Sequence, residues 1–387
     1  MLRVLIYIFP VIINYVSGGV FFITAYRFSD AGSSEFLITG TMAMWAIIYS
    51  LTSLLVGRFV NEKRAPVMII NAGFFLALVS MSFVLFPNLH LQYLWIALTG
   101  VGMAFYCAPF QVFMKTFEGD NPSSGIVFST AMYTAAWSAG LASGPFIFGI
   151  LRWQTGFYIN AFFSLCLGIG VLMVEKLRAG KQPEAKKQTI PHAEINYSQY
   201  PDYAWLGWLG AGVGTATISI VRTLEPKLAV DLGLAKMHAG SILALVSVMQ
   251  VLWGLGWINS KRWMFKPSAA LLAGLCGTAG LSLFAFSTSI PCLYLAAVFY
   301  GTYSGYFYFT MVFYALVHPL KSARYLSINE AVVGLSGITG AVGGGILAYF
   351  SNLSVTFSAC AVFVTLSTLH RIHILSSKKR KAQTGLL

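Results

Sequence analysis

Stretches of about 20 apolar residues recur from one end of this 387-residue chain to the other. A helix of about 20 apolar residues crosses the roughly 30 Å hydrocarbon core of a lipid bilayer. The runs are continuous and lack the alternation over ~10 residues that is typical of membrane β-barrel strands. We therefore predict an all-α, multi-pass membrane protein with twelve transmembrane helices, at residues 4–26, 36–56, 66–86, 91–114, 124–150, 153–174, 201–223, 238–258, 267–287, 291–317, 324–350 and 352–372.

The basic residues predict how the chain is oriented. If both termini are cytoplasmic, 20 of the 25 Lys and Arg residues fall on the cytoplasmic side. Cytoplasmic loops of membrane proteins carry such an excess, so we expect a plasma (inner) membrane protein with both termini in the cytoplasm. The same bias accounts for the net charge of +13, and we expect no nucleic-acid partner. Membrane lipids are the expected partners of the basic tail.

Glu330 is the only acidic residue that lies inside a predicted span away from its ends, and an ionisable group at membrane depth usually has a function. One interpretation assigns Glu330, with its neighbour Asn329, to coupling with a proton or another cation. The other makes Glu330 a structural latch that pairs with Arg64, Arg262 or Arg324 at the cytoplasmic face. A further pair, Arg222 and Glu225, lies at the outer end of the seventh predicted helix; we expect it to anchor the helix end, with an outer gate as the alternative.

The sequence argues against several other classes of protein. It contains no P-loop, which excludes ATP-driven transport. The five Cys and six His residues are scattered without metal-ligand spacing, so we expect no metal and no cofactor. A membrane enzyme would need clustered acid, base or metal groups, and one carboxylate inside a span does not provide them.

The two halves of the chain resemble each other. The loop Asn61-Glu62-Lys63-Arg64 has an echo in Asn259-Ser260-Lys261-Arg262, 198 residues further on. A hydrophilic stretch separates the halves. We predict an N-terminal bundle at 1–175, a cytoplasmic linker at 176–199, a C-terminal bundle at 200–374 and a basic tail at 375–387. Parallel repeats of this kind are typical of two-lobed carriers.

Twelve spans, a six-plus-six repeat and the basic loop with its echo together resemble the major facilitator superfamily, over essentially the whole chain. The resemblance implies two six-helix bundles around a central cavity lined by helices 1, 4, 7 and 10. It does not imply a substrate, because members move many classes of solute.

Two segments match motifs of that superfamily in part. The gating loop, with its echo, comprises Gly57, Arg58, Asn61, Lys63, Arg64, Asn259, Lys261 and Arg262. Asn61 stands where the family has Asp, and the second Gly of the motif is missing; the alternative is that these cations only set topology. In helix 5, Gly140, Gly144, Pro145 and Gly149 keep the frame of the antiporter motif, which favours export; the alternative is close packing of small residues. The Arg that proton–drug antiporters usually carry early in helix 4 is missing.

The resemblance also assigns a substrate cavity. Polar and aromatic side chains on the matching helices are Asn14, Tyr106, Gln111, Trp137, Thr215, Thr217, Tyr303, Tyr306 and Thr310. Such a lining suits a neutral or amphipathic solute held by stacking and hydrogen bonds. The alternative is that the aromatic residues of the tenth helix only pack between helices.

Taken together, these patterns predict a monomeric secondary active transporter of a small-molecule substrate, a small organic solute, which works by alternating access. Export is favoured, with a proton or another cation as the coupling ion. Two alternatives remain: an uptake carrier, for example of a sugar or a nucleoside, and a membrane sensor or scaffold that keeps the transporter fold without transport.

Overall fold

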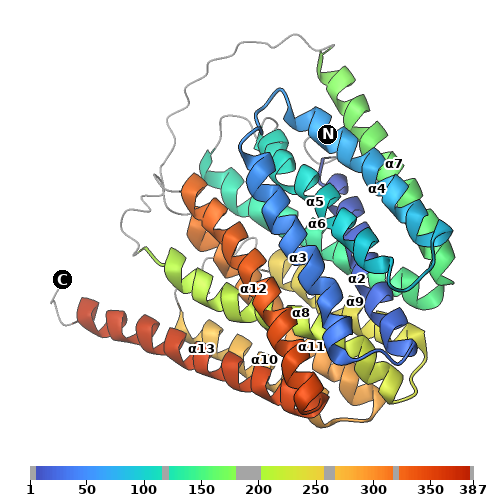
Figure 1. Cartoon of the computed structure of the whole chain (residues 1–387). Helices are drawn as coiled ribbons and strands as arrows, with labels where there is room; N and C mark the ends of the chain where they lie inside the picture. The colour runs from blue at the N-terminus through green and yellow to red at the C-terminus, as the bar shows by residue number, and fades with distance from the viewer. Residues whose placement is uncertain (1–5, 116–121, 180–201, 257–265, 317–321, 384–387) are drawn as a thin grey trace.

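The computed structural model describes residues 6–115, 122–179, 202–256, 266–316 and 322–383. These residues form twelve helices (Figure 1): α2 (Ile8–Asp30), α3 (Glu35–Gly57), α4 (Ala65–Leu85), α5 (Gln92–Lys115), α6 (Pro122–Ile150), α7 (Trp153–Ala179), α8 (Ala204–Asp231), α9 (Lys236–Gly256), α10 (Pro267–Phe286), α11 (Ile290–Leu316), α12 (Ser322–Phe350) and α13 (Leu353–Gln383). The predicted number of helices is confirmed, and most bounds agree within a few residues.

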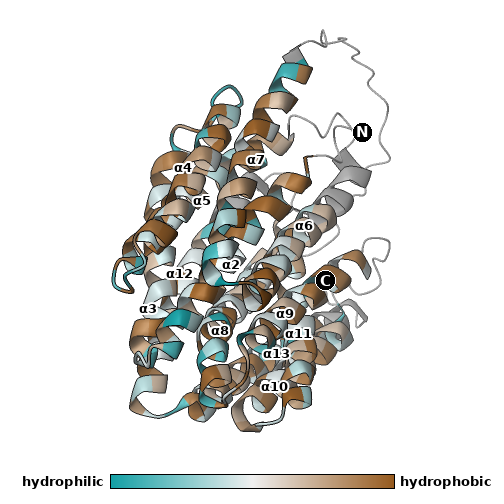
Figure 2. Cartoon of the chain, turned by 90° about the vertical axis from the view of Figure 1, so that its right-hand side faces the viewer, coloured by the Kyte–Doolittle hydropathy of each residue, from teal (hydrophilic) through white to brown (hydrophobic). Residues whose placement is uncertain are grey.

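Ten of these helices are long and apolar enough to cross a membrane within the described residues; α6 and α11 fall outside that group. α11 is rich in Tyr and α6 in Gly and Ser, which lowers the mean hydropathy of each. Figure 2 shows hydrophobic residues along most of the helices and hydrophilic ones gathered at their ends. The chain is an all-α membrane protein.

Three helices run further than the sequence predicted. α7 continues to Ala179 and α13 to Gln383, so the predicted linker and tail both begin inside helices. α8 continues to Asp231, through Pro226. Its predicted end at 223 is wrong because the charged residues and the proline that follow do not stop the helix.

Helices α2 to α7 pack on one another, as do α8 to α13. We call these the N-bundle and the C-bundle. Between the bundles, α2 packs on α8, α3 on α12 and α6 on α9. Both described chain ends, near Ile6 and Gln383, lie at one end of the molecule, here called the linker end; the opposite end is called the far end (Figure 1).

A matched pair of turns demonstrates the internal repeat. α2 and α8 end at the glycines Gly32 and Gly233, which lie 201 residues apart and have φ angles of 69° and 66°. The glycine amides donate to Ser29 and Val230, and the residues after them donate to Phe28 and Ala229. This is a glycine C-cap in the left-handed conformation, which glycine adopts without strain. The first and seventh helices therefore end in the same local structure.

At the far end the two bundles are in tight contact. A Cβ at Gly345 of α12 would overlap the hydroxyl of Thr39 in α3, and a Cβ at Gly149 of α6 would lie 3.3 Å from Gly240 in α9. Lys236 at the start of α9 donates a hydrogen bond to the carbonyl of Leu151, beyond α6. Toward the linker end, by contrast, α7 and α13 diverge (Figure 1). The structure is thus closed between the bundles at the far end.

Candidate functional site

Glu330 lies where the contact between α3 and α12 ends. It shares a face of α12 with Gly334 and Gly337, which are four and seven residues further along the helix. A Cβ at Gly334 would meet Ser50 of α3, and one at Gly337 would lie 3.8 Å from Ala46. The N-bundle therefore covers this face at both glycines. Glu330, one turn closer to the linker end, is exposed.

The carboxylate of Glu330 has two partners, and both belong to the N-bundle. The amide of Gln111 in α5 donates to one carboxylate oxygen at 3.4 Å, and the hydroxyl of Tyr49 in α3 donates to the other at 3.5 Å. Both are long for hydrogen bonds to a carboxylate. Tyr49 is stacked on Trp45, with ring centroids 4.9 Å apart. We call Tyr49, Gln111 and Glu330 the bridging site, because it joins the bundles at the edge of the opening.

Asn329 is oriented away from this carboxylate. Its carbonyl oxygen accepts a 2.7 Å hydrogen bond from the indole of Trp208 in α8, and the side chain is buried. Asn329 thus ties α12 to α8 within the C-bundle. That bond holds the segment of α12 that carries Glu330.

The proposed basic partners of Glu330 can be located only in part. Arg64 is exposed at the start of α4, and no ion pair joins it to Glu330 within the described residues. Arg262 and the side chain of Arg324 lie outside the described residues. Coupling and latching both remain predictions for Glu330.

Of the predicted cavity residues, the structure brings only Gln111 to the bridging site. Trp137 is half-buried and packs edge-on against Tyr133 of the same helix, with centroids 5.9 Å apart. Seven others are buried inside the bundles: Asn14, Tyr106, Thr215, Thr217, Tyr303, Tyr306 and Thr310.

The aromatic face of α11 packs against neighbouring helices in this conformation. Tyr303 lies against Gly277 of α10, and the hydroxyl of Thr310 donates to the carbonyl of Phe307. The guanidinium of Arg371 in α13 lies over the ring of Tyr306, 4.8 Å from its centroid. In this conformation these residues pack between helices, and their role as cavity residues stays a prediction.

Arg371 is a basic residue whose side chain is buried within the C-bundle. Its charged guanidinium makes cation–π contacts with two tyrosine rings, that of Tyr306 and that of Tyr314, whose centroid is 5.5 Å away. The run of tyrosines in α11 is visible in the sequence. Only the fold shows that α13, which carries Arg371, lies beside these tyrosines.

The first basic loop has a structural role that the sequence did not reveal. The side chain of Asn61 accepts hydrogen bonds from the backbone amides of Lys63 and Arg64, at 3.1 and 3.0 Å, just before α4 begins. Gly57 and Arg58 are exposed. The matching loop in the second half of the chain, with Asn259, Lys261 and Arg262, lies outside the described residues.

The helix 5 motif provides close contacts on two sides of α6. Cβ atoms at Gly140 and Gly144 would collide with the backbone of α2, so these positions allow the two helices to approach closely. Gly149 and the carbonyl of Pro145 lie instead against Gly240 of α9, across the bundle interface. The motif thus connects packing inside the N-bundle to closure of the far end.

Glu225 is an acidic residue that is buried within a helix, which corrects the prediction that Glu330 is alone. Its side chain is 1 % exposed and lies in α8, and one carboxylate oxygen has no hydrogen-bond partner among the described residues. The sequence analysis placed it at a helix end because the predicted helix stops at 223, eight residues before α8 does. No ion pair joins it to Arg222 in the described part of the chain.

The protein consists of two repeated six-helix bundles, which contact each other through α2–α8, α3–α12 and α6–α9 and share a polar bridge at the edge of their opening. This arrangement defines a membrane transporter rather than an enzyme. The sequence-family model described as Major Facilitator Superfamily matches residues 8–322 of the chain. The chain belongs to the major facilitator superfamily.

Two solved structures support the same fold. Both are of the nucleoside transporter NupG, one of them its D323A mutant. The structure without that mutation has a TM-score of 0.69 at 15% identity, over 96% of this chain and 98% of that one. The mutant structure has a TM-score of 0.66 at 12% identity, over 97% and 99%. No curated protein sequence matches the chain.

Proposed function

We propose that this protein is a secondary active carrier of a small organic solute that works by alternating access, with Glu330 as its coupling carboxylate. The observation that supports this proposal is the bridging site. Its carboxylate belongs to one bundle, its two donors belong to the other, and it sits where the interface opens. A carboxylate in that place changes its surroundings whenever the bundles move.

The coupling step follows from the cost of a charge at membrane depth. When the linker end closes, the N-bundle would cover Glu330, which is now exposed, and remove it from water. A buried carboxylate is expensive unless it is neutral or paired. A proton, or another cation, bound at Glu330 would remove that cost and permit the closure. The latch alternative replaces this ion with a basic side chain of the protein.

Transport in proteoliposomes as a function of pH tests this proposal. Labelled solute should exchange across the membrane by counterflow in the wild type. Glu330→Gln should retain counterflow but lose its response to an imposed pH gradient, because the amide is neutral at every pH. Equal loss of transport at every pH would favour the latch and exclude coupling. Absence of counterflow in the wild type, for every solute tried, would favour the sensor or scaffold alternative.

Among small organic solutes, nucleosides are one candidate substrate class, because both matched structures are described as nucleoside transporters. At 12–15% identity the likeness shows the fold alone, so it guides the choice of solutes. The helix 5 motif favours export of the solute. Counterflow with nucleosides, sugars and amphiphilic aromatic compounds, in right-side-out and inverted vesicles, would separate these candidates. We also propose a monomer in the plasma membrane with both termini cytoplasmic.

A further inference from the structure

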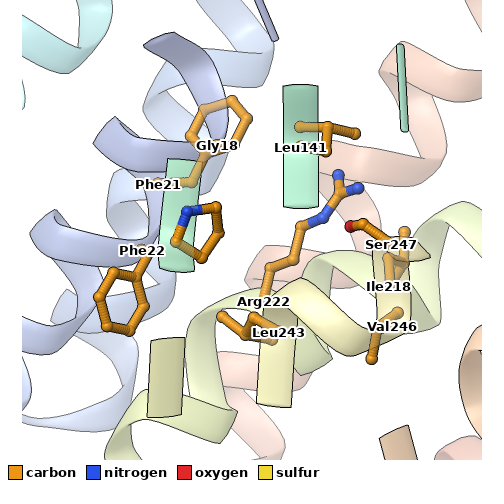
Figure 3. Close-up of a pocket in the computed structure, with 10 residues that line it drawn as sticks. Gly18, Phe21, Phe22, Leu141, Ile218, Arg222, Leu243, Val246 and Ser247 are labelled. Atoms are coloured by element: carbon orange, nitrogen blue, oxygen red, sulfur yellow. The ribbon is translucent and has the colours of Figure 1, made fainter. Parts of the chain in front are cut away.

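Arg222 points into a small cavity at the interface between the two bundles. Figure 3 shows its guanidinium directed toward Leu141 of α6 and Ser247 of α9. The N-bundle contributes Gly18, Phe21, Phe22, Leu141 and Pro145 to the lining, and the C-bundle contributes Ile218, Arg222, Leu243, Val246 and Ser247. Movement of the bundles must therefore change the shape of this space.

The guanidinium has no partner within the part of the chain that the structure describes. No hydrogen bond or ion pair joins Arg222 to another described residue, and its Nη2 atom is buried. Among the described residues that line the cavity, Ser247 is the only other one with a polar side chain, and none carries a carboxylate. Glu225, one turn further along α8, does not pair with it.

The cavity has little room for solvent beside this buried atom. It has a volume of about 10 Å³, which is the space that one water molecule needs. The Nη2 atom is buried without a hydrogen-bond acceptor among the described residues, and a buried donor of a charged group that is left without an acceptor costs free energy. Closure of the far end therefore carries an electrostatic cost that an anion would remove.

We propose that Arg222 is an anion-binding residue of the transport site, which receives an anionic group when the bundles separate at the far end. The group is a carboxylate or phosphate of the solute, or a small inorganic anion that accompanies it. Only an opened far end has room for it, because the closed cavity is the size of a water molecule. The solute-borne form rests on the proposed transport function, whereas binding of a free anion does not.

Thermal unfolding of the purified full-length protein tests the proposal without any transport measurement. The probes are chloride, acetate and inorganic phosphate, each against gluconate at constant ionic strength. The paired solutes are uridine with uridine 5′-monophosphate and benzyl alcohol with benzoate. A ligand that binds the folded state at ten times its dissociation constant should raise the Tm by roughly 2 °C.

The variants are Arg222→Gln, Arg222→Lys and, as a matched control, Arg152→Gln. Arg152 is an exposed basic residue at the same end of the molecule. The proposal expects a saturable rise in the wild type and in Arg152→Gln, a weaker one in Arg222→Lys, and none in Arg222→Gln. A response to free anions identifies an inorganic anion, and a response only to the charged member of a solute pair identifies the solute.

A second measurement needs no variant at Arg222. Phenylglyoxal modifies accessible guanidinium groups, and peptide mass spectrometry reports the extent at each arginine. The effective anion should slow modification of Arg222 at least threefold and leave Arg152 unchanged. An unaltered Tm with all probes in the wild type, an equal rise in Arg222→Gln, or equal modification with and without anion would overturn the proposal. Failed counterflow with anion binding intact would count against the transport function alone.

Discussion

The hydroxyl of Ser138 in α6 donates a 3.1 Å hydrogen bond to the side chain of Gln250 in α9, and this bond crosses the bundle interface. Gln250 in turn donates to Ser304 of α11 at 2.6 Å, so the amide remains held when Ser138 is removed. Both Ser138 and Gln250 are buried. The bond therefore stabilises the present conformation, in which the far end is closed.

Ser138→Ala should shift the protein toward the state with an open far end. A buried hydrogen bond contributes about 1 kcal/mol, so the ratio of open to closed molecules should rise roughly fivefold. Spin labels at the exposed loop residues Asn88 and Thr288, on different bundles at the far end, should report a longer average distance. Thr278→Ala removes a hydroxyl contact inside the C-bundle and should leave the distance unchanged. An identical change in both variants would contradict the assignment.

Gly345→Val should prevent full closure of the far end. The added side chain would occupy the position of the Thr39 hydroxyl, whereas Gly343 in the same helix has open space around it. Overpacking at such a contact costs about 1–3 kcal/mol. Counterflow should fall at least tenfold in Gly345→Val and change less than twofold in Gly343→Val. Normal turnover in Gly345→Val would show that this contact does not take part in the transport cycle.

Tyr306→Leu should destabilise the C-bundle, because Arg371 lies over the ring and loses that contact. Loss of the cation–π contact and of packing should cost about 2 kcal/mol. The Tm should fall by several degrees, while Tyr306→Phe, which keeps the ring, should stay within about 1 °C of the wild type. If Tyr306→Phe loses solute binding without loss of stability, then the tyrosine contacts the solute and is more than a packing residue.

Asn61→Ala should weaken the turn before α4, because Asn61 accepts hydrogen bonds from two backbone amides of that turn. Loss of these bonds should cost about 0.5–1.5 kcal/mol, and an Asp side chain can accept them as Asn does. Thermal unfolding should therefore show a lower Tm for Asn61→Ala and an unchanged one for Asn61→Asp. Asn61→Asp also introduces the acidic residue usual in the family. Slower counterflow with normal Tm would indicate that a latch has formed.

The helices and the repeat could be predicted because lipid requires long apolar runs and a duplicated loop leaves a visible offset. Glu330 stood out for the same reason, as a carboxylate in an apolar run. Its partner Tyr49 could not be found, because tyrosines in membrane spans are common and this one lies 281 residues away. Arg222 and Glu225 were assigned to a helix end, yet α8 continues past them and through Pro226. What the sequence could not provide was which side chains face the other bundle.

The far-end connections 31–34, 86–91, 151–152, 232–235, 287–289 and 351–352 join the helices two by two with very few residues. Chains this short have no slack, so one helix of a pair cannot slide far without pulling its partner. Each hairpin therefore moves as a unit with its bundle, and a displacement at one end of the molecule is passed to the other end along the helices.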